Sequence, residues 1–328
     1  MKITVTRKIP GIRLSDLEKL NSELWISQFD RPLSSQEIID YSKGTDYLLS
    51  LLTDKIDGEV MDAIGPQLKL ISNYAVGFDN IDIAAATQRG IVVTNTPCDE
   101  VNVAVAEHTW ALTLAIVRRI VEADEATKRG AYKGWEADIF IGNSLFGKTF
   151  GIIGLGRIGS MAARMAKGFG VNVIYTKREP DKKAEEELGI KYATLDELLS
   201  QSDVVSLHIP LNDETRHMIT DSVFEKMKQG SYLINTARGP IVDEHALVRA
   251  LRSGKLSGVA LDVFDNEPNV NPELIGMENV ILTPHIASAT VDAREKMCDL
   301  AVSSIEKVIK GEKPENLVNT EVWDQRRK

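Results

Sequence analysis

The sequence predicts an α/β protein with two parallel sheets, and three observations support this fold class. Strand-like and helix-like segments alternate from one end of the 328-residue chain to the other. In the second half, three strand-like segments are nearly continuous runs of Val, Ile and Leu, as expected for strands covered on both faces. A glycine-rich turn, Gly154 to Gly159, follows one such segment directly and leads into a helical pattern. We therefore expect two parallel-sheet domains.

The first domain is expected to contain five strands. Strand character is found at residues 3–5, 25–29, 47–52, 68–73 and 91–95. Helical patterns lie between these segments, for example at residues 36–43 and 82–89. The second of these patterns is followed by Gly90, which suits the position just after a helix. This order of elements predicts a flavodoxin-like unit.

The second domain is expected to contain six strands and to begin near Lys148. Its strand-like segments are residues 150–154, 172–175, 204–208, 232–235, 259–263 and 280–282. Six strands with helical crossovers match a complete nucleotide-binding domain of the Rossmann type.

Two long helical segments, at about residues 101–129 and 288–311, are expected to connect the domains. The second helix would return the chain to the first domain. We therefore expect residues 1–100 and 288–328 to form one discontinuous substrate domain and residues 101–287 to form the Rossmann domain. A deep cleft between the domains is the expected ligand site.

The turn Gly154-Leu155-Gly156-Arg157-Ile158-Gly159 fits the start of a βαβ unit that binds a dinucleotide. Gly154 permits the tight turn, Gly156 lets the backbone approach the phosphates, and Gly159 lets helix and strand pack closely. The first N–H groups of the following helix would then face the pyrophosphate. The alternative is a tight turn without a ligand. The order strand, turn, helix favours the dinucleotide site.

Composition and charge exclude several classes of function. The formal net charge of −9 argues against binding to nucleic acid, which depends on Lys and Arg. No apolar run approaches the roughly 20 residues that span a bilayer, and we expect no signal peptide. The two cysteines, Cys98 and Cys298, lack CxxC spacing, so we expect reduced thiols in the cytoplasm and no disulfide or metal site. Residues 324–328 are expected to form a solvated tail.

The residues after the second Rossmann strand bear on the choice between NAD(H) and NADP(H). In NAD sites, an Asp or Glu about 20 residues past the glycine turn bonds the ribose 2′-hydroxyl. Here the strand runs into Thr176, Lys177 and Arg178 without an acid. Since Lys177 and Arg178 would attract a 2′-phosphate, we expect NADP(H) to be preferred and NAD(H) to remain usable. Alternatively, Lys177 and Arg178 are ordinary exposed loop charges, and the protein has little preference between NAD(H) and NADP(H).

Three further motifs follow the later Rossmann strands. They are Asn235-Thr236-Ala237-Arg238-Gly239, the segment 261–268 that ends in Glu267-Pro268, and Thr283-Pro284-His285-Ile286-Ala287-Ser288. With the glycine turn, these motifs make the chain resemble the D-isomer-specific 2-hydroxyacid dehydrogenases over nearly its whole length. Within that family it is most similar to the glyoxylate/hydroxypyruvate reductases, which residues 74–82, residues 94–97 and the missing acid at Lys177 also fit.

Three side chains in these motifs are expected to carry out hydride-transfer reduction of glyoxylate or hydroxypyruvate. Arg238 offers a fork of donors that suits a carboxylate and the neighbouring keto oxygen, unless it merely pairs with a helix end. His285 can change its charge near neutral pH and is expected to donate a proton to the alkoxide. Glu267, hydrogen-bonded to the other ring nitrogen, would fix the tautomer of His285 and favour the imidazolium. All three lie where parallel strands end, which is where α/β sheets bind ligands.

The resemblance implies roles for further residues. The additional cofactor contacts that it implies are Arg157, Ile158, His208, Pro210, Thr236, Ala237, Asp262 and Ala287. Asp262 is expected to hold the carboxamide. The N–H groups of Val76 and Gly77 suit a small carboxylate, and Leu52 caps the reacting carbon or is a plain core leucine. The other histidines, His108, His217 and His245, are expected to be satisfied surface or core residues.

Other functions and the assembly state were weighed on the same residues. A dehydrogenase of another D-2-hydroxy acid, D-lactate or 3-phosphoglycerate, is the main alternative, although phosphoglycerate dehydrogenases usually keep the acid that Lys177 replaces. A nucleotide-sensing corepressor on the same fold is disfavoured, because nothing resembles a peptide-docking or DNA-binding segment. A homodimer is expected from the resemblance and from the apolar helix at 101–129. The segment 131–147 looks shortened, which leaves the role of Trp135 open.

Overall fold

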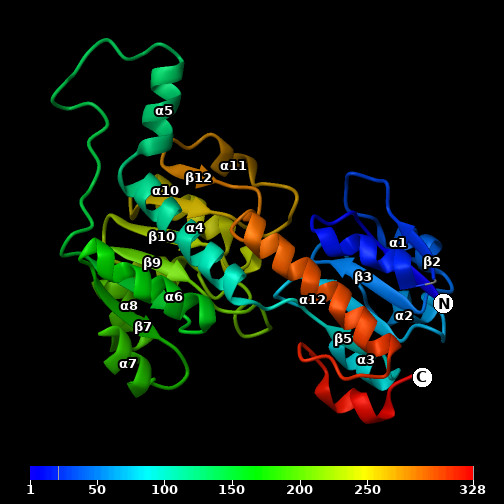
Figure 1. The fold of residues 1–328 in the computed structure, drawn as a ribbon. Coiled ribbons are helices and arrows are strands. Elements are labelled where there is room, and N and C mark those ends of the chain that lie inside the picture. The colour runs from blue at the N-terminus through cyan, green and yellow to red at the C-terminus, as the bar shows by residue number, and fades with distance from the viewer. Residues whose placement is uncertain (21, 328) are drawn as a thin grey trace. The chain divides into compact units, whose positions relative to one another are not determined.

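The computed structural model of the chain describes residues 1–20 and 22–327 and divides into two compact units. Unit 1 comprises Met1–Val101 and Ala289–Lys328, and unit 2 comprises Asn102–Ser288. Each unit contains one sheet in which all described strand pairs are parallel (Figure 1). This confirms the predicted fold class.

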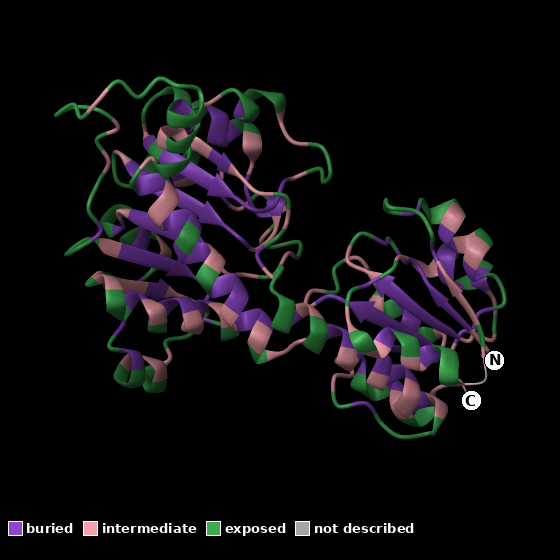
Figure 2. Ribbon diagram, turned by 45° about the horizontal axis from the view of Figure 1, so that its top comes forward, coloured by how far each residue is buried: buried purple, intermediate pink, exposed green. Residues whose placement is uncertain are grey.

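Unit 1 contains a five-stranded sheet in the order β2-β1-β3-β4-β5, which is the flavodoxin-like order. The strands are β1 (Lys2–Val5), β2 (Glu23–Ile26), β3 (Tyr47–Leu51), β4 (Leu70–Tyr74) and β5 (Val92–Thr94). The helices are η1 (Ile12–Leu20), α1 (Ser35–Ser42), α2 (Gly58–Ile64), α3 (Ile83–Gln88), α12 (Val291–Ile309) and η4 (Thr320–Gln325). Figure 2 shows that the central strands of this sheet are buried.

Side-chain caps explain where several helices of unit 1 begin. A capping box starts α1, because Ser34 accepts from the N–H of Glu37 and the Glu37 side chain accepts from the N–H of Ser34. Asp57 and Asp82 cap α2 and α3 in the same position, each accepting from an N–H group three residues later. These local signals fix the ends of the loops that follow β3 and β4.

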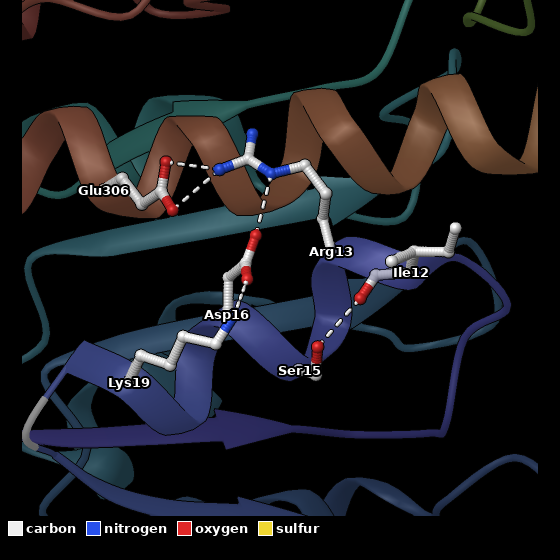
Figure 3. A network of polar contacts seen from close by, with 6 residues as sticks. All are labelled: Ile12, Arg13, Ser15, Asp16, Lys19 and Glu306. Carbon is white, nitrogen blue, oxygen red and sulfur yellow. Dashed lines mark hydrogen bonds and ion pairs between the residues drawn. The ribbon is translucent and has the colours of Figure 1, made fainter.

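The helix α12 is fastened to η1 by a network of charged side chains (Figure 3). Arg13 donates to both carboxylate oxygens of Glu306 at 2.7 Å and to Asp16 at 3.1 Å. Lys19 donates to the second oxygen of Asp16 at 2.6 Å. The Glu306 carboxylate raises the pKa of Arg13, against the opposing effect of burial. This network ties a segment from the end of the sequence to the first helix of unit 1.

The prediction of a solvated tail at 324–328 is wrong for Arg327. Its side chain donates to the carbonyl oxygens of Gly65 and Leu68, and its N–H group donates to the carbonyl of Gly90 at 2.9 Å. Because these bonds go to backbone atoms far away in sequence, no hydrophobic pattern announces them. Lys328 lies outside the described residues.

Unit 2 contains a seven-stranded sheet in the order β12-β11-β10-β9-β6-β7-β8, which extends the Rossmann order by one strand. The strands are β6 (Thr149–Ile153), β7 (Asn172–Thr176), β8 (Lys191–Tyr192), β9 (Val204–Leu207), β10 (Ser231–Asn235), β11 (Leu256–Leu261) and β12 (Val280–Leu282). The sequence predicted six of these and missed β8, because two residues at a sheet edge leave no alternating pattern.

Helices connect the strands of unit 2. They are α4 (Asp99–Val117, which starts in unit 1), α5 (Ile120–Lys128), α6 (Arg157–Ala166), η2 (Lys167–Phe169), α7 (Lys182–Leu188), α8 (Leu195–Gln201), α9 (Asp221–Lys226), η3 (Gly239–Ile241), α10 (Glu244–Arg252) and α11 (Pro272–Ile275). None of the helices within residues 1–20 and 22–327 is both long and apolar enough to cross a membrane.

The helix expected at 101–129 is broken into α4 and α5. Arg119, between them, has a left-handed backbone with φ of 53°. The carbonyl of Val117 accepts a hydrogen bond of 2.7 Å from the N–H of Asn143, so a later segment caps the end of α4. A Cβ atom on Gly142 would lie 2.4 Å from that carbonyl oxygen, so this approach requires glycine. The break between α4 and α5 could not be predicted from the local sequence, because the residues that cap α4, Gly142 and Asn143, lie more than twenty residues later.

Candidate active site at the carboxyl edge of the seven-stranded sheet

The glycine turn joins β6 to α6 at the carboxyl edge of the sheet. A Cβ on Gly154 would lie 2.5 Å from the carbonyl oxygen of His208, and one on Gly159 would lie 2.2 Å from that of Gly154. Both glycines are therefore required by packing. Gly156 is different, because its Cβ position faces open space with nothing within 4 Å. It is also the N-cap of α6 and supplies no side-chain cap, so the turn fits a phosphate group.

The residues after β7 have carboxylate partners. Lys177 lies 3.2 Å from Asp181, which also caps α7, and Arg178 lies 2.9 Å from Glu214. Both side chains of the second pair are exposed, at 85% and 76%, and exposed pairs of this kind are weak. Glu214 was missed in the sequence because it follows β9 rather than β7. The two cations expected to attract a 2′-phosphate are thus each held near an acid.

His208 and Pro210 follow β9. The Nε2 atom of His208 lies 2.9 Å from the hydroxyl of Ser206. Although part of the residue remains accessible, burial of its ring lowers the pKa of His208 to about 4, so the ring is neutral at neutral pH. Pro210 is exposed, and its carbonyl accepts a bond of 2.7 Å from Thr215.

Arg238 lies in the turn after β10. The buried Asn235 shapes this turn, because its side chain accepts from the N–H of Ala237 at 3.0 Å and donates to the carbonyl of Arg238 at 2.9 Å. A Cβ on Gly239 would lie 1.9 Å from the carbonyl group of Phe264. The turn therefore packs directly against the backbone that leads to Glu267, and only glycine permits this contact.

His285 lies after β12 and forms the expected pair with Glu267. Its Nδ1 atom is 2.9 Å from one carboxylate oxygen of Glu267, whose other oxygen accepts from the N–H of Phe264 at 3.1 Å. The backbone of His285 is left-handed, with φ of 54°, which costs about 1–3 kcal/mol for a residue other than glycine. Its N–H group lies 2.9 Å from the carbonyl of Asp262. Since Nδ1 is committed to Glu267, Nε2 is the atom that can exchange a proton with a ligand.

Asp262, directly after β11, anchors the loop that carries His285. Its side chain is fully buried, and its oxygens accept from the Thr283 hydroxyl at 2.6 Å and from the N–H groups of Ile286 and Ala287 at 2.9 and 2.8 Å. Burial by itself raises the pKa of Asp262, but hydrogen bonds from His108, Thr283 and these N–H groups outweigh it and hold the pKa below its usual range. The buried carboxylate is therefore ionised at neutral pH.

The expected substrate residues Leu52, Val76 and Gly77 lie in unit 1. Leu52 directly follows β3 and is half-buried, and the other two residues follow the adjacent β4. Asn73 donates to the carbonyl of Gly77 at 3.0 Å, and Asn95 donates to that of Val76 at 2.7 Å. The N–H groups of Val76 and Gly77 have no acceptor within the described part of unit 1. These two donors are thus presented at the carboxyl edge of that sheet.

The histidines outside the expected catalytic set differ in their surroundings. His245 is exposed on α10, and His217 lies 3.3 Å from Asp265. His108 contacts Thr283, two residues before His285, and no signal in the sequence indicates this contact. Residues 1–20 and 22–327 contain no group of three or more His, Cys, Asp and Glu side chains that could hold a metal ion.

Comparison with known proteins finds relatives along the whole chain. Residues 110–287 match the sequence model described as D-isomer specific 2-hydroxyacid dehydrogenase, NAD binding domain. The glyoxylate reductase of Thermococcus litoralis is 46% identical over 326 residues, which cover 98% of this chain and 97% of that protein.

Two similar solved structures contain different cofactors. The NADPH-dependent glyoxylate/hydroxypyruvate reductase of Sinorhizobium meliloti, in complex with NADP and malonate, is 32% identical with a TM-score of 0.86 and covers 100% of this chain and 98% of its own. The D-lactate dehydrogenase of Aquifex aeolicus, with NAD and lactic acid, is 32% identical with a TM-score of 0.84 and covers 97% and 99%. Proteins of this fold therefore bind either cofactor.

Proposed function

Since this chain belongs to the D-isomer specific 2-hydroxyacid dehydrogenase family, as its motifs predicted, we propose that it reduces glyoxylate or hydroxypyruvate to the 2-hydroxy acid with NADPH. The chain is an NAD(P)-dependent oxidoreductase. Its 46% identity to a glyoxylate reductase, over 98% of its length, supports this class directly. The observation that carries the proposed chemistry is the 2.9 Å contact between His285 and Glu267 at the carboxyl edge of the sheet.

The family motifs and the contact between His285 and Glu267 support the following roles. When bound, the nicotinamide supplies the hydride that reaches the carbonyl carbon. Arg238 binds the substrate carboxylate and polarises the carbonyl oxygen with its remaining N–H groups. His285 donates the proton on Nε2 to that oxygen and recovers one in the reverse direction. Glu267 orients the ring through its contact with Nδ1 and so presents Nε2 to the substrate.

Further contacts are proposed in each unit taken by itself. We assign the pyrophosphate to the glycine turn with Arg157 and Ile158, which lie in the exposed first turn of α6. We assign the nicotinamide side to Thr236, Ala237, Asp262 and Ala287. His208 and Pro210 are assigned to the border of the cofactor site. In unit 1, we assign substrate contacts to the N–H groups of Val76 and Gly77 and to the side chain of Leu52.

The proposed preference for NADPH rests on Thr176, Lys177 and Arg178, where no acid stands at the end of β7. A 2′-phosphate would replace Glu214 as the partner of Arg178, since this exposed ion pair is weak, and it would be a second anion beside Lys177. The reducing cytoplasm, which we propose as the location, suits the free thiols of Cys98 and Cys298.

The substrate and the cofactor can be tested in one assay. We expect glyoxylate and hydroxypyruvate to give the highest kcat/KM in a panel of 2-oxo acids, and NADPH to exceed NADH. Replacing Glu214 with Gln frees Arg178 and should lower the KM for NADPH about twofold at low salt, with KM for NADH unchanged. A preference for NADH contradicts the proposed cofactor. Pyruvate as the best substrate would favour a D-lactate enzyme, and no turnover at all would favour a nucleotide sensor.

We further propose that two copies of the chain form a homodimer through α5, α11 and the segment 129–147. Figure 1 shows α5 and this segment extending from the body of unit 2. The large apolar side chains exposed there are Ile120, Val121, Tyr132, Trp135, Ile139, Ile141, Phe146 and Ile275. So many exposed apolar residues indicate a protein–protein interface. Light scattering should give twice the chain mass of 36.2 kDa, and a monomer at micromolar concentration contradicts the proposal.

A further inference from the structure

His108, on the helix α4, contacts the residues that anchor the loop carrying His285. This loop, residues 283–287, is called the His285 loop below. The His108 side chain is 18% exposed, and its Nε2 atom lies 3.2 Å from the Thr283 hydroxyl and 3.4 Å from a carboxylate oxygen of Asp262. All of these residues belong to unit 2.

The direction of the hydrogen bonds in this cluster determines the tautomer of His108. The Thr283 hydroxyl donates its only proton to Asp262 at 2.6 Å, so its oxygen can only accept a bond from His108. A carboxylate likewise only accepts. The Nε2 atom of His108 must therefore carry a proton and donate it toward both oxygens.

The neighbours of His108 on α4 reach other parts of the same site. Thr109 shares a hydroxyl–hydroxyl bond of 3.0 Å with Thr236, in the turn that leads to Arg238. Trp110 donates from its indole nitrogen to the carbonyl of Ala162 on α6 at 2.9 Å. Thr109 and Trp110 are buried. Three successive residues of one helix thus support three segments of the candidate site.

We propose that His108 is a positioning residue for proton transfer, because its Nε2–H group fixes Thr283 and Asp262 and thereby holds His285 in place. The proposal rests on the proposed function, in which His285 is the proton donor. It adds a group that touches no reacting atom and acts through the His285 loop.

The energetic reason lies in the buried carboxylate of Asp262. It is fully buried and keeps its charge through the donors that surround it, two of which are the N–H groups of Ile286 and Ala287. Without His108, the carboxylate and the Thr283 hydroxyl lose a donor and are free to shift. The Asp262 carboxylate is one of the groups that hold the left-handed backbone of His285, so the loop would be freer to relax toward an ordinary conformation.

Two substitutions separate this role from simple packing. In His108→Gln, the amide nitrogen comes near the place of Nε2 and can donate to the same oxygens, whereas the shorter side chain of His108→Asn cannot reach them. For His108→Asn we expect kcat about 10- to 100-fold lower, as when a reacting group moves by up to about 1 Å, with KM for the oxo acid within about twofold. His108→Gln should recover most of this loss.

Hydrogen exchange gives a readout that is independent of turnover. In His108→Asn, the amides of Ile286 and Ala287 should exchange faster than in the wild type, because their acceptor is less firmly held. His108→Gln should restore slow exchange. His245→Asn, on the exposed side of α10, is the control that should change neither exchange nor kcat.

A mutant cycle covers the case in which His108→Asn folds poorly. If Thr283→Val acts on the same network, its effect on kcat combined with His108→Asn should be non-additive, whereas a general folding defect of His108→Asn would lower kcat by the same factor in both backgrounds. The proposal is overturned if His108→Asn matches the wild type in exchange and kcat, if His108→Gln is as damaging as His108→Asn, or if the cycle is additive. His285→Ala separates the two proposals. If His285→Ala keeps wild-type activity, the proposed role of His285 fails, and this result does not depend on the His108 variants.

Discussion

The two units hold the loops that carry the proposed site residues with different chemistry. In unit 2, charged groups do this work: Asp262 anchors the His285 loop, and Glu267 holds the His285 ring. In unit 1, neutral amides take their place, because Asn73 and Asn95 hold the carbonyls of Gly77 and Val76. Both loops lie at the carboxyl edge of a parallel sheet.

The difference matches what each loop is proposed to do. A loop that moves a proton needs an acceptor that orients the ring, and the Glu267 carboxylate does this through Nδ1 of His285. A loop that presents backbone N–H groups to an anion would be weakened by a carboxylate, which repels the ligand. A third amide of unit 1, Asn80, donates to the carbonyls of Leu51 and Asp54 in the neighbouring loop that contains Leu52. That neighbouring loop also uses a carboxylate, because the buried side chain of Asp54 accepts from the N–H of Leu51 at 2.8 Å.

Removing the proton donor in unit 2 should have the largest effect. For His285→Ala we expect kcat about 100- to 10,000-fold lower near neutral pH, the range typical of a general acid. Binding of NADPH, measured by fluorescence titration, should stay within about threefold of the wild type, because the glycine turn is untouched. Wild-type turnover in this variant would show that another group donates the proton.

Weakening an amide in unit 1 should have a smaller effect of a different kind. Asn95→Ala removes the bond of 2.7 Å to the carbonyl of Val76. We expect KM for the oxo acid to rise about 2- to 10-fold, the equivalent of about 0.5–1.5 kcal/mol, with kcat and its pH profile unchanged. Asn95→Asp should raise KM for the oxo acid more than Asn95→Ala does, because it brings a negative charge near the N–H groups of Val76 and Gly77 that are proposed to bind the carboxylate. A loss of kcat in Asn95→Ala at saturating substrate would contradict the proposed division of roles, in which the amides of unit 1 affect only substrate binding.

The sequence predicted the fold and the contact between His285 and Glu267 for identifiable reasons. Parallel strands place their carboxyl ends along one edge, so motifs after β6, β10, β11 and β12 had to meet. The glycine turn and the pairing of His285 with Glu267 follow from this rule and from the family motifs. The buried strands could also be predicted, because their residues are strongly apolar.

The features that the sequence did not reveal depend on contacts between distant residues. Glu214 pairs with Arg178, which lies 36 residues earlier in the sequence, and His108 contacts Thr283, which lies 175 residues later. Asn143, which follows α5 in the sequence, donates its N–H to the last residue of α4. Single polar residues of this kind carry no periodic pattern, and a lone histidine on a helix is usually an ordinary one. Only their placement in space shows which charges and carbonyls they satisfy.

A crystal structure with NADP and a non-reacting analogue of the oxo acid would test the central claim most directly. We expect the Arg238 guanidinium to bind the carboxylate and the Nε2 atom of His285 to lie within hydrogen-bond reach, about 2.6–3.2 Å, of the oxygen on the reacting carbon. A complex in which Arg238 and His285 both turn away from the bound acid would contradict the account.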